Sequence, residues 1–424
     1  MIKILKYGID NDEIFKRVIP KVDVKDIVKN IIDDVIKRGD TALKEYTLKF
    51  DKANLDSLLV TEDEMQEALA TVDKRFMDVL ERAKDNIYAF HINQKKNPFE
   101  IRKENGVIMG QKVTPIEKVG IYVPGGTASY PSTVLMDAIP AKIAQVKEVI
   151  MTTPSMPNGK VNPLVLAAAK VASVDKIIKI GGAQAIGALA YGTETVPKVD
   201  KIVGPGNAFV AEAKRQVYGM VSIDMIAGPS EILIVSDKYS NPRYVAADLL
   251  SQAEHDKLAS AVLITDDLDF AKKVQDSIEA ELKTLDRYDI ARASIDDYGK
   301  IVIADSIEEA IEIANEIAPE HLELCVNEPF DYLEMVKNAG SVFLGRYTPE
   351  ALGDYMAGPN HTLPTSGSAK FSSPLSVDDF VKKTQYTFFT KDSLEQLSSD
   401  IEYFAKKEGL TAHAKSAVIR FENE

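Results

Sequence analysis

Short apolar segments that end in glycine or proline turns and lead into helices recur through most of this chain. They indicate strands that are buried on both faces, because an exposed strand face would alternate apolar and polar residues. Parallel strands need crossover connections, which helices usually provide. The pattern therefore predicts α/β architecture with two α/β units, whose strands lie at residues 119–123, 149–152, 177–180 and 201–203 and then at 232–235, 261–265, 301–304, 322–326 and 341–344.

Three turns in the first series lie where a strand ends and a helix begins, which is where α/β sheets bind ligands. They are Pro124-Gly125-Gly126, Gly181-Gly182-Ala183-Gln184 and Gly204-Pro205-Gly206-Asn207. None is a G-x-G-x-x-G motif followed by an acidic residue about twenty positions later, so the usual dinucleotide fingerprint is absent. From the motifs alone, the glycines are explained equally well by tight turns.

The first hundred residues have a different pattern. Apolar residues at spacings of three and four predict helices over residues 24–38, 40–47, 61–72 and 74–94, and we interpret His91 within the last one as structural. Residues 99–116, with Asn105-Gly106 between β-forming stretches, predict a hairpin.

Composition excludes several classes of protein. The 51 basic and 65 acidic residues give a formal charge of −14, and no cluster of Lys or Arg suits a nucleic acid. No apolar run approaches the roughly eighteen residues of a membrane span, and the first residues lack the apolar core of a signal peptide. We expect a cytoplasmic protein with neither nucleic acid nor membrane as partner. The single cysteine, Cys325, excludes an internal disulfide and a cysteine-based metal cage.

A metal site would therefore need histidine, carboxylate or amide ligands. Gln252 and His255 stand three residues apart near the end of a helical pattern, so both could reach one cation from one helix face. A solvated helix end is the alternative for this pair. The other histidines of the second half are His321, His361 in a glycine- and proline-containing loop, and His413 in the last helical segment.

Taken together, several long motifs resemble histidinol dehydrogenases, which oxidise L-histidinol to L-histidine with NAD⁺. The resemblance runs from about residue 119 to 384 and again over 408–413, and no functional position departs from the family's pattern. The motifs, in chain order, are V-G-I-Y-V-P-G-G, G-G-A-Q-A-I, V-D-K-I-V-G-P-G-N-A-F-V, A-G-P-S-E, S-Q-A-E-H-D, P-E-H-L-E-L, G-D-Y-M-A-G-P-N-H-T-L-P-T and G-L-T-A-H.

The resemblance implies roles for residues at the matching positions. Zinc would be bound by an amide, a carboxylate and two imidazoles, namely Gln252, His255, Asp354 and His413. Glu320 and His321 match the catalytic pair, and His321 and the four zinc ligands would also contact the substrate. Further substrate contacts would come from Ser230, His361 and Glu408, and NAD⁺ contacts from Tyr122, Gln184 and Asn207.

The resemblance also implies two similar incomplete Rossmann-like domains, small helical terminal segments and an intertwined homodimer. We expect an N-terminal arm at 1–22 and a first α/β domain from 23–118 with 231–318. A second domain would combine 119–230 with 319–378. The segment 379–424 would form a small domain that supplies Glu408 and His413 to the partner subunit, so the active site would be shared.

The residue types suit this chemistry. Histidine titrates near neutrality, so His321 could take the hydroxyl proton while hydride leaves, and Glu320 could then activate water to hydrate the aldehyde for a second oxidation. Each turnover would consume two NAD⁺. On a strand, Cys325 would share a face with His321 and could in principle bond the aldehyde, although a lone cysteine between Leu324 and Val326 is more often a small core residue.

Two other classes of protein share part of this pattern. A zinc hydrolase would use the metal, Glu320 and His321 but would not require paired α/β units with glycine-rich turns, and NADH formation separates the two activities. A metal-dependent binding protein would bind histidinol tightly without turnover, and Glu320 and His321 would then have no catalytic function.

Overall fold

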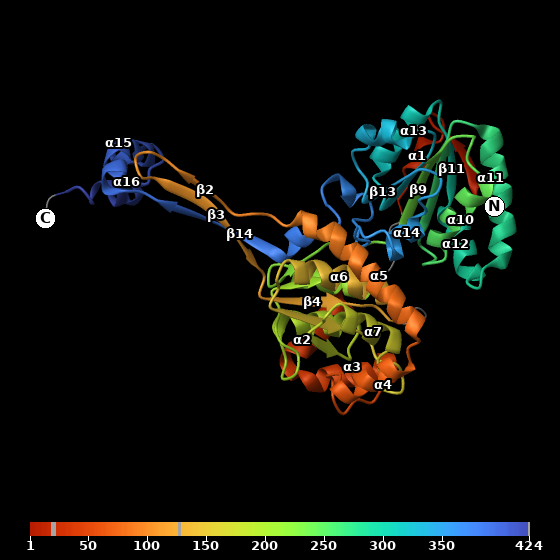
Figure 1. The fold of residues 1–424 in the computed structure, drawn as a ribbon, viewed down its shortest axis with the longest axis horizontal. Coiled ribbons are helices and arrows are strands. Elements are labelled where there is room, and N and C mark those ends of the chain that lie inside the picture. The colour runs from red at the N-terminus through yellow and green to blue at the C-terminus, as the bar shows by residue number, and fades with distance from the viewer. Residues whose placement is uncertain (18–22, 126–128, 423–424) are drawn as a thin grey trace. The chain divides into compact units, whose positions relative to one another are not determined.

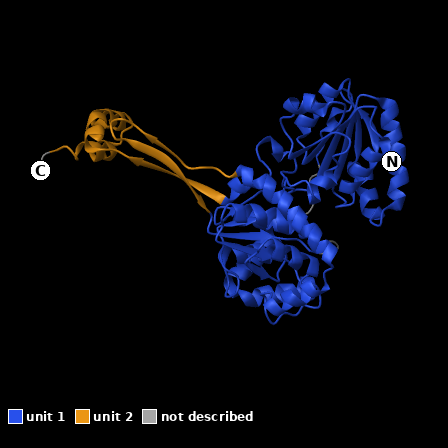
Figure 2. Ribbon diagram, in the orientation of Figure 1, with its two compact units in different colours: residues 1–94, 116–380 blue, residues 95–115, 381–424 orange. Residues whose placement is uncertain are grey.

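A computed structural model describes residues 1–17, 23–125 and 129–422. The chain divides into two compact units: residues 1–94 with 116–380, and residues 95–115 with 381–424 (Figure 2). Among the residues named in the sequence predictions, Gly126 and part of the expected arm 1–22 lie outside the described residues. No helix in the described ranges combines the length and apolar character needed to cross a bilayer.

The first sheet of the larger unit has five parallel strands in the order β6-β5-β4-β7-β8. Their bounds are β4 (Lys118–Tyr122), β5 (Glu148–Thr152), β6 (Lys176–Ile178), β7 (Lys201–Val203) and β8 (Ser222–Ile223). The crossovers contain α6 (Pro131–Ile143), α7 (Pro163–Val171), α8 (Gly182–Tyr191) and α9 (Ala208–Val217). Almost every side chain of β4, β5 and β7 is buried, which explains their uninterrupted apolar sequences.

The N-terminal helices pack against the crossover helices of this sheet (Figure 1). They are α2 (Lys25–Arg38), α3 (Asp40–Asp51), α4 (Glu62–Thr71) and α5 (Lys74–His91). Apolar residues of α2 and α3 form one core with residues of α8, α9 and the strands, while α4 and α5 contact α6 and α7. The predicted helices are confirmed, although α3 is four residues longer than expected and α5 ends three residues earlier.

The second sheet has six parallel strands in the order β1-β11-β10-β9-β12-β13. They are β1 (Lys3–Lys6), β9 (Glu231–Ser236), β10 (Ser260–Thr265), β11 (Lys300–Ile303), β12 (His321–Cys325) and β13 (Ser341–Leu344). One face packs against α10 (Pro242–Ala253), α11 (Leu268–Glu281) and α12 (Tyr288–Tyr298), and the other against α13 (Ile307–Ile317). Two short helices, α1 (Asn11–Ile14) and α14 (Glu350–Tyr355), belong to the same part of the chain.

The two sheets share one strand order. Numbered along the chain from β4 or from β9, each runs third, second, first, fourth, fifth, and β1 adds an edge strand to the second sheet. This is the doubly wound order without its sixth strand. The prediction of two similar incomplete Rossmann-like domains is therefore confirmed.

The expected grouping of segments into those domains is wrong. Strand β12 pairs with β9, with His321 opposite Ile232, so residues 231–318 and the strands after 319 share one sheet. Helices α2 to α5 pack on the other sheet, with residues 119–223. The expected arm contains β1, which pairs with β11. The sheet order explains this result, because a crossover through α13 returns the chain to the vacant side of β9.

The smaller unit contains an antiparallel sheet in the order β14-β3-β2 and two helices. Its hairpin, β2 (Phe99–Arg102) and β3 (Ile108–Pro115), confirms the predicted one, and β14 (Val381–Phe388) extends it. Helices α15 (Lys391–Lys407) and α16 (Thr411–Val418) follow. The predicted segment 379–424 thus omitted residues 95–115, which are joined to it by strand pairing.

Candidate functional site

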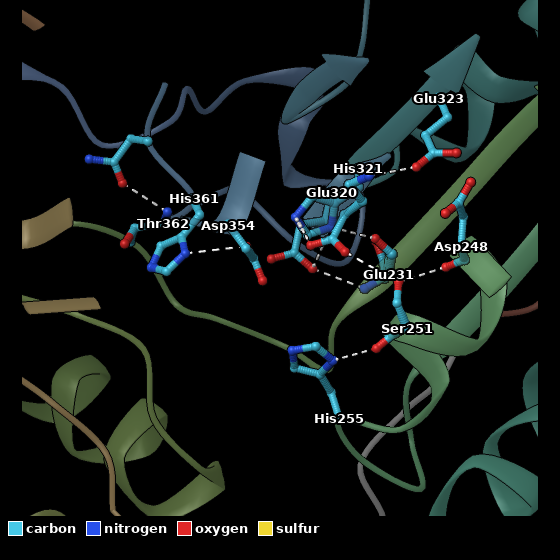
Figure 3. Close-up of polar contacts among 12 residues, drawn as sticks. Glu231, Asp248, Ser251, His255, Glu320, His321, Glu323, Asp354, His361 and Thr362 are labelled. Atoms are coloured by element: carbon cyan, nitrogen blue, oxygen red, sulfur yellow. Dashed lines mark hydrogen bonds and ion pairs between the residues drawn. The ribbon is translucent and has the colours of Figure 1, made fainter. Parts of the chain in front are cut away.

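Glu320 and His321 lie at the amino-terminal end of β12, beside the first residue of β9 (Figure 3). The backbone of Glu231 holds both side chains. Its N–H donates to Glu320 Oε2 at 2.9 Å, and its carbonyl accepts from His321 Nδ1 at 3.0 Å. Both side chains are buried, so the strand register places an acid and an imidazole in a solvent-poor position.

This hydrogen bond sets the protonation of His321. A carbonyl oxygen can only accept, so Nδ1 carries the hydrogen and Nε2 keeps its lone pair. Burial lowers the pKa of His321 to about 4, because a charged imidazolium would lose its hydration. At neutral pH the ring is therefore an uncharged base.

Glu320 has the opposite shift. Burial raises the pKa of Glu320 well above its ordinary value, and the carboxylates of Glu231, Asp354 and Glu350 raise it further. Its Oε2 lies 3.7 Å from His321 Nδ1. A carboxylate with a raised pKa is a stronger base once it is ionised.

Asp354 and His361 form an ion pair in the same cluster. His361 Nδ1 lies 3.2 Å from Asp354 Oδ1. Burial favours the neutral form of each, but the hydrogen bond and mutual attraction prevail, so the pKa of Asp354 falls to about 2 and that of His361 rises. His361 Nε2 also lies 3.4 Å from the hydroxyl of Thr133 on α6.

Glu350, at the start of α14, is a member of the cluster that the sequence analysis missed. Its Oε1 lies 3.6 Å from His321 Nε2, and Ser251 Oγ donates to its Oε2 at 3.3 Å. His321, Glu350 and Asp354 each offer one ligand atom, and these three atoms lie within 4.8 Å of one another, so the three residues could bind a cation. The spacing of residues in the sequence gives no signal for Glu350, because only the folding of the chain after β13 brings Glu350 close to β12.

Gln252 and His255 are placed differently from the expectation. Helix α10 ends at Ala253, so the two residues do not share a helical face, and a turn follows in which the His255 N–H bonds the Gln252 carbonyl at 3.1 Å. His255 Nδ1 donates to the Ser251 carbonyl at 2.9 Å, which leaves Nε2 available. Gln252 Oε1 is buried and has no hydrogen-bond partner among the described residues. A buried amide oxygen without a donor fits a cation ligand.

The remaining residues implied by the resemblance are distributed over other parts of the structure. Ser230 is half-buried and directly precedes β9, beside Glu231. Glu408 and His413 belong to the smaller unit, where Glu408 ends α15, His413 lies on α16 and both are exposed. The cluster described above consists only of residues of the larger unit.

The three residues matched to NAD⁺ contacts lie at the carboxyl edge of the five-stranded sheet. Tyr122 ends β4, Gln184 lies in the first turn of α8, and Asn207 caps α9 by accepting from two backbone N–H groups. Tyr122 Oη accepts from the Gly182 N–H at 3.0 Å. Strands β4 and β7 are neighbours whose crossovers run to opposite sides, and such a switch point is where open α/β sheets bind ligands.

Cys325 does not have the properties of a nucleophile. It is buried at the end of β12, and its thiol donates to Glu323 Oε2 at 3.7 Å. Burial and the neighbouring carboxyl groups raise the pKa of Cys325, so the thiolate is scarce at neutral pH.

Comparison with known proteins assigns the chain to a family. The histidinol dehydrogenase family profile matches residues 16–421. A histidinol dehydrogenase of Clostridium acetobutylicum is 55% identical over 98% of this chain and 94% of its own length. The chain belongs to the histidinol dehydrogenase family. Another family member, from Bacillus cereus, is 52% identical over 97% of this chain and 99% of that protein.

A solved structure supports the same assignment for the fold. The histidinol dehydrogenase of Elizabethkingia anophelis superimposes with a TM-score of 0.94 at 39% identity, covering 99% of this chain and 98% of that one. The similarity to the family therefore extends through the N-terminal helices, beyond the motifs that first indicated it. Membership of this family leaves the hydrolase and binding-protein alternatives without support.

The geometry predicts two histidines with opposite titration in the metal-free protein. We expect His321 to titrate near pH 4 and His361 above its ordinary value, as followed by NMR of ¹⁵N-labelled imidazoles and assigned with His321→Asn and His361→Asn. Because the folded pKa of His321 lies below its unfolded value, the unfolded state binds more protons between about pH 4 and 6.5, and this residue's contribution to stability rises with pH there. A His321 ring that is charged at pH 6 would contradict the geometry.

Proposed function

We propose that this chain oxidises L-histidinol through L-histidinal to L-histidine with two NAD⁺, the last steps of histidine biosynthesis. One observation carries the proposal: in a chain of this family, His321 is a buried neutral imidazole whose Nε2 keeps its lone pair. An alcohol oxidation needs such a base to take the hydroxyl proton as hydride leaves.

The residues that would hold zinc fit that ion. Gln252 Oε1 lacks a partner among the described residues, Asp354 is ionised, and His255 has its second nitrogen fixed by a carbonyl, as metal-bound histidines usually do. His413 would complete the set from the partner subunit. Zinc, when bound, would be a Lewis acid that orients the imidazole and amine of histidinol.

The chain's own residues then account for the two oxidations. His321 Nε2 accepts the hydroxyl proton in the first step, while the Glu231 carbonyl on Nδ1 stabilises the imidazolium that forms. The aldehyde must be hydrated before a second hydride can leave. Glu320, in its ionised form, accepts a proton from the attacking water, while the His321 imidazolium returns its proton to the aldehyde oxygen. The neutral His321 then takes the proton of the hydrate's hydroxyl as the second hydride leaves. The Asp354–His361 ion pair positions substrate groups near the cluster.

The dinucleotide would bind at the carboxyl edge of the five-stranded sheet. Gly204, after β7, has φ +112°, and a Cβ there would lie 2.2 Å from the Tyr122 carbonyl, so only glycine permits the turn. Asn207 opens α9 beside it, and the free N–H groups of a helix N-terminus favour phosphate.

We also propose an intertwined homodimer in which Glu408 and His413 serve the partner's site. The smaller unit has three strands and two helices around little buried apolar surface. Many of its large apolar side chains are exposed, which is typical of a surface that meets another subunit: Phe99, Ile101, Phe388, Leu397, Tyr403, Phe404, Leu410 and Ile419.

The first test concerns the metal. A chelator should abolish turnover and Zn²⁺ should restore it, and His255→Ala and Asp354→Ala should each retain little zinc by elemental analysis. His91→Asn, which alters a buried histidine outside the cluster, should bind zinc normally. Because a histidine must be deprotonated to bind metal, zinc should be released below about pH 6. Full activity in zinc-free protein would refute the ligand set.

The second test separates the two oxidations. Glu320→Gln should slow oxidation of supplied L-histidinal more than that of L-histidinol, whereas His321→Asn should slow both by about 10² to 10⁴, the usual contribution of a general base. Cys325→Ala should keep both steps. Equal losses in Glu320→Gln would assign the glutamate to another role, and loss of only the aldehyde step in Cys325→Ala would favour a covalent route.

The third test concerns the shared site. His321→Asn and His413→Asn dimers, each inactive, are mixed under conditions that exchange subunits. Random pairing makes half of the dimers mixed, and each mixed dimer has one site with both residues intact, so activity should recover to about a quarter of wild type. A mixture shown by mass to have exchanged, yet still inactive, would show that His413 serves its own subunit.

A further inference from the structure

A fully buried polar network lies beneath the Gly204 turn at the carboxyl edge of the five-stranded sheet. Asp224 Oδ2 accepts from the Gly204 N–H at 2.8 Å, and Lys214 Nζ donates to the Gly204 carbonyl at 2.9 Å. Lys214 and Asp224 also form an ion pair with side chains 2% and 1% exposed. Both backbone groups of Gly204 are thus held by charged side chains, which fixes the turn after β7.

Asp137 on α6 lies close to this turn. It is completely buried, and a Cβ placed on Gly204 would come within 3.0 Å of Asp137 Oδ2. The other oxygen, Oδ1, accepts from the Thr362 hydroxyl at 2.9 Å. One carboxyl group therefore lies close to the Gly204 turn and accepts a hydrogen bond from the loop of His361.

The His361 loop is attached to α6 at several points. Asn360 Nδ2 donates to the Met136 carbonyl at 2.7 Å, and Asn360 Oδ1 accepts from the Thr362 N–H at 2.8 Å. With the Thr362–Asp137 bond, these contacts flank His361 on both sides. The position of the His361 ring thus depends on α6, the helix that follows β4 and the turn at Gly125.

Asp137 Oδ2 is buried and has no hydrogen-bond partner in the described part of the chain. Such an oxygen is costly to bury, and an apolar side chain of similar shape would avoid that cost. The mechanism proposed above does not use it. Its position between the turn and the loop suggests a role that depends on both.

We propose that Asp137 is a positioning residue that couples the dinucleotide site to the substrate site, through Gly204 on one side and Thr362 and His361 on the other. The inference rests on the proposed function, because it assumes that NAD⁺ binds at the Gly204 turn and histidinol beside His361. A ligand that orders the turn would thereby order the loop, so each ligand would tighten the binding of the other by the same factor.

The experiment measures this factor in the zinc-loaded dimer. NADH and L-histidinol are the probes, because this pair cannot exchange hydride. The Kd of L-histidinol is measured by calorimetry with and without saturating NADH in wild type, Asp137→Asn, Thr362→Val and the double variant. Thr47→Val is the control, since it also alters a buried threonine hydroxyl, on α3 and outside the network.

In wild type and in Thr47→Val, NADH should tighten histidinol binding about fivefold or more. In both single variants the factor should fall towards one, and the double variant should lose no more than either single variant, because the two residues act through one bond. An unchanged factor in both variants would overturn the proposal, even if both melt at lower temperature. So would losses that multiply in the double variant, or a factor of one in wild type.

The proposed function is checked separately by turnover of L-histidinol in the same wild-type preparation. If that turnover is absent, the assigned activity fails. If wild type turns over and binds both probes but the coupling does not depend on Asp137, only the present inference fails.

Discussion

The hydrogen bond from His321 Nδ1 to the Glu231 carbonyl is the interaction on which the proposed chemistry depends. It fixes the tautomer, directs Nε2 towards Glu350, and can exist only because β12 lies beside β9 in register. Burial lowers the pKa of His321 and so keeps the ring neutral. A side chain on a loop would have neither constraint, so a rigid parallel sheet supplies the base with both its orientation and its protonation state.

The two sheets share a strand order but present different edges to the chemistry. The residues matched to NAD⁺ contacts lie at the carboxyl edge of the first sheet, where β4 and β7 form a switch point. The catalytic candidates lie at the amino edge of the second sheet, at the start of β9 and β12. At the carboxyl edge of the second sheet, Arg346 pairs with Asp237 and donates to Ser240 and Asn327, so these polar groups bond one another. In the proposed mechanism, the two similar domains therefore serve different functions.

Much of the fold could be predicted from the sequence because strands buried on both faces leave a strong local signal. Nine strands were located within one or two residues. The strands β1, β8 and β14 were missed, because each is short or exposed and is placed only by pairing with another strand. The domain grouping failed for a related reason, since local pattern does not specify which strands become neighbours. At the site, the motifs identified His321 and Glu320. Glu350 and Asp137 belong to no motif, so only their contacts in the folded chain indicate a role for them.

The proposed activity is a four-electron oxidation in which one site carries out both steps. The most direct test is the stoichiometry of zinc-loaded protein given limiting L-histidinol and excess NAD⁺, with NADH followed by absorbance and products by chromatography. The proposed mechanism predicts two NADH and one L-histidine for each L-histidinol consumed. One NADH with accumulation of L-histidinal, or consumption of L-histidinol without NADH, would contradict it.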